Sequence, residues 1–154
     1  MKHTIKKYNL TGETRNVIGV ILYRIKAIKN FGNVKIGDLG GYIENESNLS
    51  QDSLAWVSQN TEVYGNAVVC GNAVVYGNAE VSGDAVVFGN AKVFGNAVVF
   101  GDAVVFGNAE VSGDAKVFGN AKVCGNAKVC GDAKVSWDAE VDGNAKVFGN
   151  AQIT

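Results

Sequence analysis

Hydrophobic positions in the C-terminal two thirds of the chain recur every six residues. Valine stands at every sixth position from Val57 onward, and the series ends with Ile153. An alanine follows each valine four positions later, with Thr61 as the first member of that second series. Asn or Asp precedes each alanine, and glycine precedes the Asn or Asp except at Gln59 and Trp137. A fixed internal period of this kind is typical of architectures in which one short unit stacks on the next.

Neither a helix nor an antiparallel meander fits the six-residue period. Six residues of an α-helix turn through about 600°, which would spread the valines around all sides. A glycine in every second turn would also cost a helix about 1 kcal/mol each. Gly-Asn is a common two-residue hairpin turn, but here it would place Phe88 opposite Ala91. Facing strands would then mix core and solvent residues on both sides of the sheet.

Parallel stacking of short strands satisfies the pattern. In the tetrapeptide AKVF at residues 91–94, Ala and Val point to one side while Lys and Phe point to the other. The Gly-Asn or Gly-Asp pair then turns a corner, where a left-handed backbone is favourable for these residue types. Coils stacked in register place Val on Val, Ala on Ala and Asn on Asn, which requires nearly identical repeats. The sequence therefore predicts an all-β parallel coil with Val and Ala inside.

The repeats, as in VFGNAKVFGNA, resemble those of the hexapeptide-repeat left-handed β-helix, the fold of the trimeric acyltransferase-like superfamily. In that family three hexapeptides form one triangular coil of eighteen residues. The resemblance covers roughly residues 52–154. It implies a left-handed parallel β-helix of nearly six coils, and packing with Val and Ala leaves no ligand-sized lumen.

Residues 1–50 are predicted to form a small β-rich N-terminal cap on a β-helix of residues 51–154. We expect strands over residues 4–10 and 17–29 around a turn at TGET, and a second turn at GDLGG. Such a cap protects the terminal coil, because an exposed parallel edge pairs readily with other chains. The segment DLGGYIE…NLS…AWV, which leads into the GNA repeats, resembles the openings of phage- and prophage-encoded repeat proteins often labelled as transferases.

Two near copies within the repeats keep the interior and change the surface. Between residues 81–110 and 111–140, outward Val and Phe residues give way to Lys, Cys and Ser. Stacking by eighteen residues gathers six apolar side chains on one face, and we call this set the apolar strip: Val68, Cys70, Val86, Phe88, Val104 and Phe106. A patch of a few hundred Å² begins to mark an interface. The alternative interpretation is that the corner aromatics only shield the coil and favour β structure.

Composition and charge indicate the compartment in which the protein works but say little about its function. The 154-residue chain is 47% apolar and 19% charged, with a net charge of −1. No apolar stretch reaches the ~18 residues of a membrane span, and the start lacks the apolar run of a secretory signal. Three cysteines fit free thiols in a reducing compartment. We therefore expect a cytoplasmic protein without a membrane anchor, and the phage resemblance implies a bacterial host cell.

Catalytic chemistry is sparse in the repeats. Hexapeptide-repeat enzymes are typically acyltransferases that use a histidine as general base, with acyl-CoA bound between neighbouring subunits. The only histidine here is His3, outside the repeats, and no inserted loop interrupts the coils between Val57 and Ile153. A general base must lie within hydrogen-bond reach of its proton, so we predict no catalytic residue and no cofactor.

Metal and nucleic-acid sites are not predicted either. Stacked aspartates, Asp84 on Asp102 and Asp114 on Asp132, could hold a hard cation. Asp alternates freely with Asn at this corner, however, because both suit turn geometry. The cysteines lack C-x-x-C spacing. Basic residues of the head are interleaved with strand-forming apolar residues, which argues against a nucleic-acid surface: they are Lys6, Lys7, Arg15, Arg24, Lys26 and Lys29.

The leading functional prediction is a non-enzymatic, phage-derived binding or scaffold protein. It would self-associate as a trimer or dimer, or engage a host or virion macromolecule, through the apolar strip. Inhibition of a host defence component is one form that the phage resemblance implies. The alternative is an acyltransferase-like enzyme with an acyl-CoA site at a subunit interface.

Overall fold

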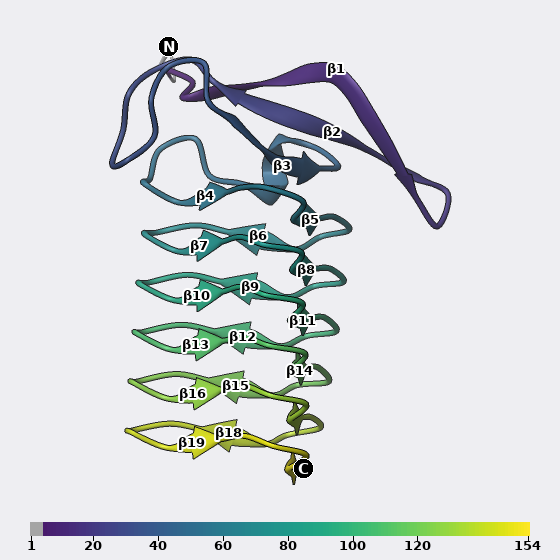
Figure 1. Ribbon diagram of the computed structural model, residues 1–154, viewed down its shortest axis with the longest axis vertical. Helices are drawn as coiled ribbons and strands as arrows, with labels where there is room; N and C mark the ends of the chain where they lie inside the picture. The colour runs from purple at the N-terminus through teal and green to yellow at the C-terminus, as the bar shows by residue number, and fades with distance from the viewer. Residues whose placement is uncertain (1–4) are drawn as a thin grey trace.

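Residues 5–154, which the computed structural model describes, form a solenoid of stacked parallel coils beneath a cap of longer strands (Figure 1). Each coil contributes one two-residue strand to each of three sheets, and stacked positions are 18 residues apart. The predicted all-β parallel β-helix of nearly six coils, with a β-rich cap, is confirmed. Whether residues 1–50 and 51–154 are separate domains stays a prediction.

The three sheets form the three sides of the solenoid. The six-stranded sheet contains β4 (Trp56–Val57), β7 (Val74–Val75), β10 (Lys92–Val93), β13 (Glu110–Val111), β16 (Lys128–Val129) and β19 (Lys146–Val147). The five-stranded sheet contains β6 (Val68–Val69), β9 (Val86–Val87), β12 (Val104–Val105), β15 (Lys122–Val123) and β18 (Glu140–Val141). The nine-stranded sheet contains β1 (Tyr8–Val17), β2 (Val20–Ala27), β3 (Leu39–Ile43), β5 (Glu62–Val63), β8 (Glu80–Val81), β11 (Val98–Val99), β14 (Lys116–Val117), β17 (Lys134–Val135) and β20 (Gln152–Ile153). A short 3₁₀ helix, η1 (Glu46–Asn48), precedes the first coil.

Valine and alanine fill the interior as the pattern predicts. Val87 lies in register with Val105 of the next coil, and both side chains are completely buried. The main chain is satisfied between coils, as where the Phe88 N–H donates to the Val105 carbonyl at 3.0 Å. Each buried valine stabilises the fold by about 1.5–3 kcal/mol relative to exposure. The core is therefore a continuous column along the solenoid axis.

Glycine makes the corners except at Gln59 and Trp137, and these two residues adopt the same left-handed backbone, with φ values of 59° and 57°. Gly107 has a φ of 67°, and a Cβ on it would lie 2.9 Å from the backbone nitrogen of Gly125 in the next coil. We expected Asn and Asp to share the left-handed geometry, but no Asn or Asp within residues 5–154 has a positive φ. Their side chains form ladders instead, as where Asn108 Nδ2 donates to Asn126 Oδ1 at 3.1 Å.

The cap is built onto the nine-stranded sheet. β3 pairs antiparallel with β2 and parallel with β5, where Tyr42 lies opposite Glu62. Gly40 permits the close approach, since a Cβ there would lie 2.6 Å from the Val57 carbonyl oxygen. Beneath the cap, the Trp56 ring meets Phe31 edge-on at a centroid distance of 5.3 Å. The first coil thus shares its core with the cap.

Both turns expected in the head are placed differently in the structure. Residues 11–14 lie inside β1 and give an irregularity in its pairing with β2, whereas the chain reverses at Ile18 and Gly19. These two residues have φ values of 49° and 81°, which is the geometry of a two-residue hairpin loop between the paired Val17 and Val20. In GDLGG only the first glycine, with a φ of 96°, belongs to the turn, because β3 already begins at Leu39.

Candidate interaction surfaces

The structure brings the six residues of the apolar strip together on the five-stranded sheet. The outward valines of β6, β9 and β12 stand in register, with Val86 opposite Val68 on one side and Val104 on the other. At the corner that follows, the rings of Phe88 and Phe106 are stacked at 5.1 Å and 3°. Phe88 is 36% exposed, and the other five side chains are half-buried.

Aromatic stacking by itself does not distinguish this face. The other two corners carry equivalent pairs, Tyr76 on Phe94 and Phe100 on Phe118, each at 4.9 Å and nearly parallel. These pairs agree with the alternative interpretation, in which corner aromatics shield the coil. The five-stranded sheet differs in its three consecutive outward valines. The next two outward positions on the same face are Lys122 and Glu140.

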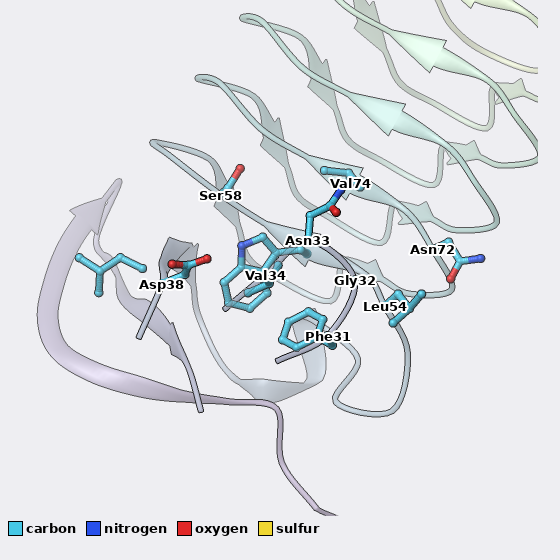
Figure 2. Close-up of a pocket in the computed structure, with 11 residues that line it drawn as sticks. Phe31, Gly32, Asn33, Val34, Asp38, Leu54, Ser58, Asn72 and Val74 are labelled. Carbon is cyan, nitrogen blue, oxygen red and sulfur yellow. The ribbon is translucent and has the colours of Figure 1, made fainter. Parts of the chain in front are cut away.

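A second apolar surface, which the sequence analysis missed, lies where the cap meets the first two coils. It is a groove of about 520 Å³ (Figure 2). Its apolar lining consists of Phe31, Val34, Leu39, Leu54, Trp56 and Val74. Asn33, Asp38, Ser58 and Asn72 add polar groups. The available signal was Trp56, a large aromatic residue at an outward repeat position, followed eighteen residues later by Val74.

The end of the β1–β2 hairpin is a third apolar feature that the sequence analysis missed. Ile18 is 92% exposed at the tip, and Ile21 on the adjoining strand is 42% exposed. Gly19 closes the loop by donating its N–H to Asn16 Oδ1 at 2.9 Å. The hairpin projects beyond the side of the coils (Figure 1).

The basic residues of the head are mostly engaged with other groups. Arg15 Nη1 lies 2.8 Å from Glu62 Oε2, and its guanidinium covers the Tyr42 ring at 3.9 Å. Arg24 Nε lies 2.9 Å from Glu13 Oε2. Two more of these residues are also engaged, since Lys6 pairs with Glu46 at 3.2 Å and Lys7 is buried. The Arg15–Glu62 pair joins the hairpin to the solenoid, whereas the Arg24–Glu13 pair links the two strands of the hairpin. The expectation that the head does not bind nucleic acid stays a prediction.

Among the described residues, those that were considered for catalysis or metal binding do not come together in the structure. His3 lies outside the described residues. Three of the corner aspartates, Asp84, Asp114 and Asp138, accept hydrogen bonds from stacked Asn side chains, as where Asn66 Nδ2 donates to Asp84 Oδ1 at 2.9 Å. Burial raises the pKa of the Cys70 and Cys124 thiols, which disfavours the thiolate form. Among residues 5–154, no three His, Cys, Asp or Glu side chains gather in a way that could hold a metal ion.

Comparison with known proteins adds no family. Neither the protein-family models nor the curated proteins include a match to this chain. Within residues 5–154, no helix has the length and apolar character needed to cross a bilayer.

Proposed function

We propose that this protein is a non-enzymatic binding or scaffold protein that self-associates through the apolar strip. The observation that carries the proposal is the register of Val68, Val86 and Val104 on one face, bordered by the stacked Phe88 and Phe106. Three aligned valines have no role in filling the core, because the inward valines already do so. An apolar surface of this kind is stabilised by burial against a partner.

The geometry of the strip suits a repeated, flat contact. Its side chains project at the regular spacing of stacked parallel strands, about 4.8 Å. A second copy offers the same spacing and the same apolar character, so the strip is complementary to itself. A dimer or a trimer of parallel solenoids would bury it, and the proposal covers both.

A host or virion macromolecule is the other partner that the proposal covers. The resemblance of the head to phage- and prophage-encoded repeat proteins supports a partner of this kind. Inhibition of a host defence component would be one such activity. Binding of acetyl-CoA, measured by calorimetry, would instead favour the acyltransferase-like alternative.

The test compares two lysine substitutions at stacked corner aromatics. Phe88→Lys places a charge inside the strip, and we expect association to weaken by about 2 kcal/mol, or roughly 30-fold. Phe100→Lys is the matched control, because it disrupts an equivalent stack on a different face. The measurement is the concentration dependence of the average mass by sedimentation equilibrium, with far-UV circular dichroism to confirm folding.

Two results would contradict self-association through the strip. One is a wild-type chain that stays monomeric throughout the accessible concentration range. The other is an equal loss of association in Phe88→Lys and Phe100→Lys. A monomeric wild-type chain would leave only a different macromolecule as occupant of the strip.

A further inference from the structure

The tip of the β1–β2 hairpin carries a residue that its backbone conformation disfavours, and no contact within residues 5–154 of the same chain compensates for it. The two-residue loop Ile18-Gly19 has positive φ at both positions, a geometry that strongly favours Asn-Gly. Isoleucine is disfavoured there because its branched side chain crowds the left-handed backbone. Ile18 is nevertheless 92% exposed, so it buries almost nothing in the single chain. Departures from local preference of this kind concentrate at functional sites.

The groove at the cap is an apolar surface without an occupant in the single chain. Phe31 and Trp56 are nearly buried, while Leu39 and Leu54, which also line the groove, are each 52% exposed. Asp38 is the one charged residue of the lining, and its Oδ2 already accepts the Lys35 N–H at 2.9 Å. The groove therefore favours an uncharged apolar group.

The chain itself carries a group of that description. Residues 16–21, which form the hairpin tip, read NVIGVI and contain no charged side chain. Figure 1 shows the tip at one end of the cap and the loop of residues 28–37, which contributes to the groove, at the other end. A chain whose tip and groove lie at opposite ends cannot fill its own groove.

We propose that the groove binds the Ile18 hairpin tip of a second copy of this chain. The branched side chain of Ile18, with Ile21 behind it, enters between Leu39 and Leu54 over the floor of Phe31 and Trp56. Strain at Ile18 is offset by burial in the partner. Tip and groove are different surfaces, so the contact is heterologous and generates a closed ring or an open filament.

The proposal does not depend on the apolar strip, and its test weakens the strip contact equally in every protein compared. All proteins carry Phe88→Lys. Ile18→Asn then restores the favoured Asn-Gly loop and deletes the apolar tip, so we expect a higher melting temperature together with loss of self-association. Leu54→Glu, at an exposed position of the groove lining, is expected to abolish association from the other side while leaving the tip intact.

Mixing the two variants is the decisive measurement. The Ile18→Asn protein still has a groove and the Leu54→Glu protein still has a tip, so the mixture can form one tip–groove contact. We expect each variant alone to sediment as a monomer and the equimolar mixture to form a 1:1 heterodimer that grows no further.

Three results would overturn the proposal: a monomeric Phe88→Lys parent, unchanged association after Ile18→Asn, or a mixture that stays monomeric. The last two results do not bear on the strip, whereas a monomeric Phe88→Lys parent beside an associating wild type would mean that the strip accounts for all of the self-association. Circular dichroism and the melting temperature of each variant exclude misfolding as the cause of lost association.

Discussion

Lys7 is one of the residues that fasten the cap to the first coil. Its Nζ donates hydrogen bonds to the carbonyl oxygens of Ser53 at 2.6 Å and Ala55 at 2.5 Å, and lies 4.7 Å from the centre of the Phe31 ring. Burial, followed by the charge of Lys29, lowers the pKa of Lys7 from 10.5 to about 8. The charged amine is thus tolerated through its contacts but is less favourable in the folded chain than in water.

The lowered pKa predicts how stability changes with pH. Between pH 8 and 10.5 the unfolded chain retains the Lys7 proton while the folded chain loses it. The free energy of unfolding contributed by Lys7 therefore rises with pH across this window and is constant below it. In Lys7→Met the rise is absent, and two buried carbonyls lose their donor at a cost of about 1–3 kcal/mol. We expect the difference in stability between wild type and Lys7→Met to widen from pH 8 to pH 10.5.

Urea denaturation of both proteins at a series of pH values measures this difference. Burial also raises the pKa of Tyr64 to about 12, and raises that of Tyr8, Cys70 and Cys124. Those groups lower stability at alkaline pH, because they ionise first in the unfolded chain. They are common to both proteins and cancel in the comparison. A difference that stays constant with pH would show that Lys7 does not titrate in this window.

At the scale of the coil, glycine has two separate roles that substitution can distinguish. Gly107 and Gly143 belong to the same vertical stack and have similar φ values of 67° and 60°. A Cβ on Gly107 would lie 2.9 Å from the Gly125 nitrogen, whereas a Cβ on Gly143 would meet nothing within 4 Å. Glycine is therefore required at Gly107 both for its left-handed backbone and for the close approach of the next coil. At Gly143 it is required only for the left-handed backbone.

Alanine substitutions should therefore differ in cost. Gly143→Ala introduces a left-handed alanine and is expected to lower stability by about 1–2 kcal/mol. Gly107→Ala carries the same strain and also forces two coils apart, which adds about 1–3 kcal/mol. Denaturant midpoints of the two variants and the wild type provide the comparison. Equal costs would mean that the stack adjusts without loss, contrary to the close backbone contact.

Elements of the coils could be predicted from the sequence because their rule is local and repeated. The inward direction of Val87 and the corner at Gly89 follow from the same hexapeptide repeat as in every other coil. A single departure from the repeat, such as Trp137, therefore does not change the prediction. The cap has no such repetition. Its hairpin turns at Ile18, whereas the sequence predicted the turn at residues 11–14. Strand β1 continues through residues 11–14, where only its pairing with β2 is irregular.

The candidate surfaces also divide into those that follow from the repeat and those that depend on the irregular cap. The apolar strip was predicted because stacking by eighteen residues alone determines which side chains share a face. The groove was not, since it joins residues 31–39 to residues 54–74 through packing that no periodicity describes. The exposure of Ile18 depends likewise on how far the hairpin projects, which is a property of tertiary structure.

At the scale of the whole molecule, the fold and the strip depend on different periods. Any hexapeptide can occupy any side of the solenoid, because the core needs only Val and Ala at their positions. The strip needs residues that are 18 positions apart to remain on one side. Removing one hexapeptide therefore preserves the core but rotates every later residue to the neighbouring face.

Two deletions of equal length separate these requirements. Removal of residues 97–102 leaves Phe88 on the five-stranded sheet and moves Phe106 to the nine-stranded sheet, so the stacked pair is split. Removal of residues 79–84 moves four of the six strip residues together, so the stacked phenylalanines survive on their new face with Val86 and Val104, while Val68 and Cys70 stay behind. We expect both proteins to fold with the wild-type far-UV spectrum and a modest loss of stability. In an Ile18→Asn background, sedimentation should show association only after removal of residues 79–84.

Equal association of the two deletions would locate self-association outside the strip. Loss of folding in both would mean that the hexapeptides are not interchangeable and that the core depends on the identity of each side.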